Sequence, residues 1–221
     1  MTLYAYRICP FCCKVKAAAR ASRVAIKTVE VNPLTKSQIA FSRDHRKVPI
    51  AVFQDGRVLV ESDRIVDELV RDAEPAFKSD EARHWSRWAS QDLALMIYPN
   101  ITRSFSECRE TLAYADEAFS PLEAWAVRWI GAAGMSLAHS KVKRKYGIED
   151  ERDALRRRLD EWNDQVELGP FRAGHPAPDL GDVAVFGVLG AVAGTRAHAE
   201  IMSDYPAIAA WATAVDAALP P

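Results

Sequence analysis

The sequence of 221 residues is poor in cysteine, nearly neutral in net charge and free of long apolar runs. Its cysteines are too few and too clustered to cross-link a chain of this length: Cys9, Cys12, Cys13 and Cys108. This usage favours a reducing, cytoplasmic compartment. No second Cys/His pair lies at zinc-ligand spacing, so we expect no metal site.

Charge and hydropathy argue against two classes of partner. The chain has 29 basic and 30 acidic residues and lacks the basic excess typical of proteins that bind nucleic acid or anionic lipid. The longest apolar run, residues 183–194, is too short to span a bilayer. The N-terminal "MTLYAYRICP" lacks the basic and apolar regions of a signal peptide. We therefore expect no nucleic-acid partner and no membrane span, and small molecules as partners.

Short strand-like and helical runs alternate up to about residue 75. The predicted order is βαβ followed by ββα: "TLYAY", a helix over 11–22, "AIKTVEV", a helical stretch over 35–43, the strands of "VPIAVFQDGRVLVES", and a helix over 63–70. Asp55-Gly56 predicts a two-residue type I′ hairpin turn, because Gly tolerates positive φ.

Beyond Pro75 only long helical patterns follow. They predict helices over 80–115, 120–146, 150–167, 180–195 and 205–218. Within "PDLGDVAVFGVLG", Asp179 is placed to cap a helix whose third position is Asp182. We interpret this pair of acids as a folding element.

The segment "CPFCCKVKAAA", residues 9–19, contains the candidate reactive thiols. Cys9 follows a strand and precedes a helix, where free amides, the helix dipole, Lys14 and Lys16 would stabilise a thiolate. Cys12 lies one turn further and could form a disulfide with Cys9, or it is a buried, inert thiol. Cys-x-x-Cys in a βαβ pattern is typical of thioredoxin-like redox proteins. Cys13 and Cys108 are interpreted as packing residues.

Two further segments predict a binding pocket beside Cys9. In "KVPI", a cis bond before Pro49 would leave the Val48 backbone free to pair with a peptide-like ligand. In "VES", Ser62 begins a helix whose amides could hold a carboxylate. A reactive thiol, a free backbone edge and a carboxylate-binding helix end together describe a glutathione pocket.

With these motifs the chain resembles the glutathione S-transferase superfamily over nearly its whole length, and more closely the soluble region of the membrane-associated type 2 prostaglandin E synthases. The matching segments are "CPFCCKVKA", "VEVNP", "RKVPI", "YPNITR", "GAAGM" and "DLGDVAVFGVL". The resemblance implies an α+β fold, with a thioredoxin/glutaredoxin-like domain over 1–75 and an all-α domain over 80–221.

The resemblance also implies roles for individual residues. Glutathione would be held by Lys47, Val48, Pro49, Glu61 and Ser62, with Tyr6, Cys9 and Phe11 around its thiol. A second pocket, for a small hydrophobic co-substrate, would be shaped by Tyr98, Ile101 and Phe105. The alternative is that Tyr98 and Phe105, at helical spacing, belong to the core.

Two departures from the resemblance concern the membrane and haem. This sequence begins at the first strand, without the membrane-anchoring segment of that group. The group also holds haem with glutathione, and a histidine lines its site, whereas "LALMIYPN" has none. We therefore expect glutathione to be bound but not haem, although Lys141, Lys143 and Arg144 could pair with propionates. The basic run "KVKRK" is either a solvated helix face or part of the cleft.

Three function classes follow for this site. The first is a glutathione-dependent transferase or isomerase with Cys9 as the glutathione-interacting thiolate. The second is a glutaredoxin-like thiol-disulfide oxidoreductase that uses Cys9 and Cys12. The third is a binding protein without turnover on the same fold. The sequence leaves open the identity of the co-substrate and whether two copies pair as a homodimer.

Overall fold

A four-stranded sheet with two helices forms the first part of the protein. The computed structural model describes residues 1–221. Its sheet has the order β2-β1-β3-β4, with β1 and β2 parallel and the other pairs antiparallel. The elements are β1 (Thr2–Ala5), α1 (Pro10–Ala21), β2 (Lys27–Glu30), β3 (Ile50–Val52), β4 (Val58–Val60) and α2 (Ser62–Leu69). The predicted order βαβ then ββα is confirmed.

Two local predictions in this part are wrong. The stretch 35–43 contains only a 3₁₀ turn, Ser37–Ile39. The hairpin has a three-residue loop, because Phe53 pairs with Arg57 and the Gly56 amide donates to the Phe53 carbonyl at 3.1 Å. Only Gly56 has positive φ (83°), whereas a type I′ turn needs it at two successive residues.

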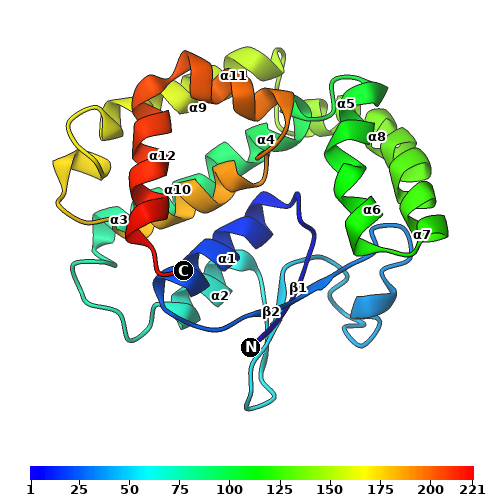
Figure 1. Ribbon diagram of the computed structural model, residues 1–221, viewed down its shortest axis with the longest axis horizontal. Helices are drawn as coiled ribbons and strands as arrows, with labels where there is room; N and C mark the ends of the chain where they lie inside the picture. Colours follow the sequence, from blue (N-terminus) through cyan, green and yellow to red (C-terminus); the bar gives the residue numbers. More distant parts are fainter.

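Helices make up the rest of the chain (Figure 1). They are α3 (Asp80–Trp88), α4 (Ala94–Asn100), α5 (Phe105–Thr111), α6 (Ala115–Ala118), α7 (Pro121–Ala126), α8 (Ala132–Lys145), α9 (Glu151–Val166), α10 (Leu180–Gly190), α11 (Arg196–Asp204) and α12 (Pro206–Ala218). π-helical turns at Ala89–Leu93 and Val127–Gly131 join α3 to α4 and α7 to α8. The predicted class, an α+β domain followed by an all-α domain, is confirmed.

The helix boundaries differ from the prediction in two places. The segment 80–115 is interrupted after Asn100, where Ile101 leaves helical geometry and Ser104 caps a new helix. Helix α11 was missed, because its sequence "RAHAEIMSD" is mostly polar and follows the Ala- and Gly-rich end of α10. No helix combines the length and the apolar character that crossing a membrane requires.

The two parts join where α10 packs beside α1 (Figure 1). A Cβ atom added at Gly187 of α10 would lie 2.6 Å from the Lys14 Cα atom and 2.8 Å from the Cys13 carbonyl oxygen. Only glycine therefore permits this approach of the helices. The C-terminal end also docks on α1, where Arg20 pairs with Asp216 at 2.5 Å. Helix α1, which carries the cysteines, is thus held by both parts of the protein.

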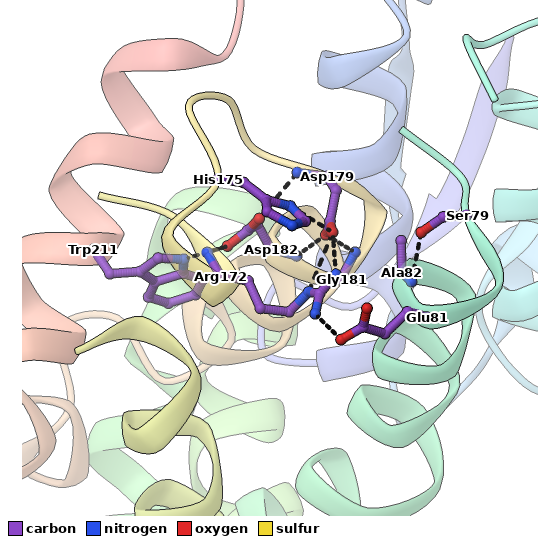
Figure 2. Close-up of polar contacts among 9 residues, drawn as sticks. All are labelled: Ser79, Glu81, Ala82, Arg172, His175, Asp179, Gly181, Asp182 and Trp211. Atoms are coloured by element: carbon purple, nitrogen blue, oxygen red, sulfur yellow. Dashed lines mark hydrogen bonds and ion pairs between the residues drawn. The ribbon is translucent and has the colours of Figure 1, made fainter. Parts of the chain in front are cut away.

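The start of α10 is closed by its own side chains (Figure 2). Asp179 Oδ1 accepts hydrogen bonds from the amides of Gly181 (2.8 Å) and Asp182 (3.1 Å), and Asp182 Oδ2 accepts from the Asp179 amide at 2.9 Å. Asp182 Oδ1 also accepts from the Trp211 indole at 2.7 Å. The fully buried Arg172 pairs with Asp179 at 2.6 Å. The predicted capping role of Asp179 and Asp182 is confirmed.

Candidate active site

Cys9 occupies the N-cap position of α1. Its backbone is extended (φ -87°, ψ 117°), and Pro10 begins the helix. The Cys9 amide donates to the Tyr6 carbonyl at 3.2 Å, and the Cys9 carbonyl accepts the first helical hydrogen bond from Cys13 at 2.9 Å. The thiol therefore belongs to the residue from which the unpaired amides of the first helical turn follow.

The surroundings of the Cys9 sulfur favour a thiolate. Hydrogen bonding from the Cys12 side chain, and then from the amides of Cys12 and Phe11, lowers the pKa of Cys9, although burial opposes this shift. Cys12 is fully buried, and burial raises its pKa well above the usual range, as does its hydrogen bond to Cys9. Burial also raises the pKa of Cys13 to about 12. Of the three clustered thiols, Cys9 is thus the one whose pKa is lowered.

Lys14 does not stabilise the Cys9 thiolate, contrary to the prediction. At 3.6 residues per turn, Lys16 lies on the same helix face as Cys9, whereas Lys14 lies on another face. Lys16 contributes to the lowered pKa of Cys9. The Lys14 side chain is fully buried, and Nζ donates to Asp63 Oδ1 (2.5 Å), to the Ser86 carbonyl (2.6 Å) and to Ser90 Oγ (2.7 Å). Lys14 therefore joins α1 to α2 and α3.

A polar cavity of about 330 Å³ lies at the start of α2. Both parts of the protein contribute to its wall: Phe11, His45, Lys47, Val48, Pro49, Glu61, Ser62, Asp63, Ser90, Gln91 and Tyr146. The structure thus brings Lys47, Val48, Pro49, Glu61 and Ser62 together. Glutathione has two carboxylates and one ammonium group, and this wall offers both cationic and carboxylate side chains, so the residues present fit that ligand.

The helix end that faces this cavity is open. Glu61 precedes α2 with a left-handed backbone (φ 69°), and its side chain makes no capping hydrogen bond. The first amides of α2 therefore have no side-chain acceptor from the N-cap residue, which suits them to a carboxylate ligand. Asp63 in the first turn is held by Lys14 and by Ser90, whose hydroxyl donates to Asp63 Oδ1 at 2.9 Å.

The chain segment opposite Cys9 has the predicted backbone. The Val48-Pro49 bond is cis, as the sequence predicted. Val48 lies before β3 and takes part in no turn or loop hydrogen bond, so its amide and carbonyl groups are open to a ligand.

An apolar cavity of about 400 Å³ adjoins the polar one. Hydrophobic residues make up 14 of the 17 in its wall: Tyr6, Ile8, Cys9, Pro10, Phe11, Pro33, Ala94, Leu95, Ile97, Tyr98, Ile101, Leu112, Tyr114, Gly131, Met135, Val142 and Tyr146. The structure therefore places Tyr6, Cys9, Phe11, Tyr98 and Ile101 around one space. Burial raises the pKa of Tyr6 to about 12, so this phenol stays protonated.

Phe105 is not part of this cavity, which corrects the pocket role that the family resemblance implied. The predicted helix over 80–115 breaks after Asn100, and Phe105 begins α5 beyond that break. Its side chain is 40% exposed, and its ring centroid lies 6.1 Å from that of Trp129.

The basic run of α8 does not line either cavity. Lys143 pairs with Glu151, and the Lys145 ammonium lies 4.8 Å from the Tyr146 ring centroid. Val142 and Tyr146 are the residues of this segment that face the apolar cavity. Of the two alternatives for "KVKRK", the solvated helix face is therefore favoured over part of the cleft, because no cation of this run lies in either cavity wall.

Sequence reasoning missed several residues of the polar cavity: His45, Asp63, Ser90, Gln91 and Tyr146. Ser90 and Gln91 lie in the π-helical turn after α3, and Tyr146 ends α8, so all three come from the helical part. No motif marks them. Only His45 and Asp63, next to "KVPI" and "VES", had a neighbouring signal in the sequence.

Comparison with known proteins identifies the family. The model of the glutathione S-transferase N-terminal domain matches residues 3–77, and that of the glutathione S-transferase C-terminal domain matches residues 145–214. The chain belongs to the glutathione S-transferase superfamily. Both cavities lie between the two matched domains and the helices that connect them.

Two relatives align with this chain along most of its length. Prostaglandin E synthase 2 of Mus musculus is 28% identical over 255 residues, which cover 91% of this chain and 66% of that protein. Prostaglandin E synthase 2 of Danio rerio is 25% identical over 261 residues, which cover 96% of this chain and 69% of that protein. The chain thus spans about two thirds of the length of these relatives.

Solved structures confirm the fold. BphK, a bacterial glutathione S-transferase seen in a ternary complex, has a TM-score of 0.61 at 19% identity, over 99% of this chain and 98% of that one. A glutathione S-transferase of Methylobacillus flagellatus with glutathione bound has a TM-score of 0.59 at 19% identity, over 100% of this chain and 99% of that one.

Proposed function

We propose that this protein is a glutathione-dependent transferase or isomerase that acts on a small hydrophobic substrate, with Cys9 as the thiolate that meets the glutathione sulfur. The observation that carries the proposal is the position of Cys9, at the start of α1 and in the wall of the apolar cavity, beside the polar cavity. Glutathione in the polar cavity would present its sulfur to Cys9 and to a co-substrate in the apolar one.

The roles of the polar residues follow from their chemistry. The α2 amides and Ser62 would hold the γ-glutamyl carboxylate, and the open Val48 backbone would pair with the cysteinyl part of glutathione. Glu61 would meet the ammonium group, and Lys47 the carboxylate at the other end of the tripeptide. Phe11 and Tyr6 would flank the sulfur. Tyr98 and Ile101 would contact the co-substrate.

A glutaredoxin-like oxidoreductase is the second candidate, and the Cys12 side chain supports it. The Cys9 thiolate would attack oxidised glutathione, so that a Cys9–glutathione disulfide forms, the S–S bond of oxidised glutathione breaks, and one glutathione thiolate leaves. Cys12 could then displace the second glutathione and form the Cys9–Cys12 disulfide. Because burial raises the pKa of Cys12, this second step would be slow.

Mass spectrometry after incubation with oxidised glutathione tests both candidates. Wild type, Cys9→Ser and Cys12→Ser are compared. We expect one glutathione adduct on Cys9 in wild type and Cys12→Ser, and none in Cys9→Ser. Wild-type protein that ends as a Cys9–Cys12 disulfide would favour the oxidoreductase, and an adduct that survives in Cys9→Ser would contradict the role of Cys9.

The residues of the apolar cavity do not fit haem. Its wall contains no histidine, and Lys143, a cation that could have met a propionate, is paired with Glu151. We therefore propose that the protein binds glutathione without haem. In a haem titration with glutathione present, we expect no saturable shift of the Soret band at one equivalent. Such a shift, lost without glutathione, would contradict the proposal.

A further inference from the structure

The polar and apolar cavities meet at two aromatic residues. Phe11 and Tyr146 are the only residues that line both spaces. Lys47, Val48 and Ser62 line the polar cavity alone, and Cys9 lines the apolar cavity alone. A ligand that occupies both cavities must therefore pass Phe11, from α1, and Tyr146, from the end of α8.

The sequence after α8 fixes the position of Tyr146. Gly147 has a left-handed backbone (φ 65°), and the Ile148 amide donates to the Lys143 carbonyl at 2.9 Å. The Gly147 amide donates to the Arg144 carbonyl at 3.4 Å. These two bonds form a Schellman motif, in which a glycine ends a helix at a defined residue. Ile148 is buried, so the helix end that carries Tyr146 is anchored in the protein.

The hydroxyl group of Tyr146 is free for a ligand. It makes no hydrogen bond within the protein, whereas the Tyr98 hydroxyl, in the same apolar cavity, donates to the Met135 carbonyl at 3.0 Å. The Tyr146 side chain is 38% exposed in this structure. A phenol donates one hydrogen bond, and burying it under a ligand costs free energy unless the ligand supplies an acceptor.

We propose that Tyr146 is a specificity-determining residue, whose ring contacts both glutathione and the co-substrate and whose hydroxyl donates a hydrogen bond to the co-substrate. This inference rests on the proposed function. It assigns the co-substrate to a chemical class: a largely apolar molecule with a hydrogen-bond acceptor, such as a carbonyl oxygen, within one or two bonds of the atom that reacts with the glutathione sulfur.

Two S-substituted glutathiones of equal chain length test the proposal. S-hexylglutathione places an alkyl chain in the apolar cavity, and S-(2-oxohexyl)glutathione adds a carbonyl group next to the carbon that is bonded to sulfur. Their dissociation constants are measured by calorimetry for wild type, Tyr146→Phe and Tyr146→Ala. Tyr205→Phe is the matched control, because it removes a tyrosine hydroxyl that lies outside both cavities and donates to Asp160 Oδ1 at 2.7 Å.

The ratio of the two dissociation constants shows whether the Tyr146 hydroxyl binds the carbonyl group of the ligand. We expect Tyr146→Phe to weaken the oxohexyl ligand about five- to tenfold and to leave the hexyl ligand within about twofold, because only one hydrogen bond is lost. Tyr146→Ala should weaken both ligands, since the ring is also removed, and Tyr205→Phe should keep the wild-type ratio.

Other results overturn the proposal in distinguishable ways. If wild type binds both ligands and Tyr146→Phe keeps the wild-type ratio, the role of Tyr146 is refuted while the proposed function stands. An equal change of the ratio in Tyr205→Phe would also refute it, because the effect would not be specific to Tyr146. If wild type binds neither ligand nor glutathione, the proposed function fails, and this inference fails with it.

Discussion

The starts of α2 and α10 are two acidic helix ends built in opposite ways. At α10 the side chains of Asp179 and Asp182 are almost fully buried and accept hydrogen bonds from three backbone amides and the Trp211 indole (Figure 2). At α2 the N-cap residue Glu61 makes no capping hydrogen bond and faces a cavity together with Asp63. A closed helix end stabilises the fold, whereas an open one is available to a ligand.

This difference separates folding from binding within one protein. Changes at the start of α10 should lower the free energy of unfolding without altering thiol chemistry. Changes at the start of α2 should weaken glutathione binding and leave the free energy of unfolding nearly unchanged. The start of α1 is a third case, because its N-cap residue Cys9 makes no capping hydrogen bond with its side chain and has a lowered pKa.

The largest effect is expected from Asp179→Ala. It removes the acceptor of two amides and leaves the fully buried Arg172 with Glu81 as its remaining carboxylate partner. Breaking a buried ion pair in this way costs about 3–5 kcal/mol of unfolding free energy, measured by urea denaturation. Asp179→Asn keeps a capping oxygen and should lose less. The comparison fails if Asp179→Ala and Glu61→Ala unfold at the same urea concentration.

Asp182→Asn should have the next largest effect on stability. The amide nitrogen of asparagine would replace one carboxylate oxygen, so either the Asp179 amide or the pair of donors from Arg172 and Trp211 loses an acceptor. A buried donor without a partner costs about 1–3 kcal/mol in urea denaturation. Alkylation of Cys9 is the control and should not change. Equal stability of this variant and wild type would show that the network tolerates a missing acceptor.

Ser62→Ala should affect binding more than folding. Loss of one hydrogen bond to a carboxylate weakens glutathione binding about tenfold, since hydrogen bonds to charged groups contribute about 1.5 kcal/mol or more. Calorimetric titration with glutathione measures the change, and urea denaturation of the same variant checks the fold. Unchanged affinity for glutathione would place its carboxylate elsewhere than at the start of α2.

The smallest effect concerns the pH at which Cys9 is alkylated. Because its pKa is lowered, Cys9 should reach half of its maximal rate with iodoacetamide at lower pH than an ordinary thiol, and at far lower pH than Cys13. Lys16→Met should raise this midpoint slightly, whereas Lys14→Met should leave it unchanged. Peptide-resolved mass spectrometry follows each thiol. A larger shift in Lys14→Met than in Lys16→Met would contradict the assignment of Lys16.

Local patterns predicted most elements, and the misses have physical causes. The type I′ turn was inferred from Asp55-Gly56, but strand register made the loop one residue longer and put only Gly56 at positive φ. The resemblance placed Phe105 in the co-substrate pocket with Tyr98 and Ile101, but the helix breaks after Asn100 and Phe105 begins α5. Lys14 was assigned to the thiolate because it is near in sequence, although five residues along a helix turn a side chain away.

Four features could be predicted from the sequence: the fold class, the thiol at the start of α1, the cis Val48-Pro49 bond and the acidic cap of α10. These features depend on neighbours within a few residues, through caps, turns and periodicity. Three other features are visible only in the tertiary structure. The buried Lys14 side chain connects α1 to α2, Phe105 lies outside the cavity, and Tyr146 lines both cavities. Those outcomes depend on contacts between segments far apart in the chain, and single-sequence patterns contain no information on which distant helix faces will meet.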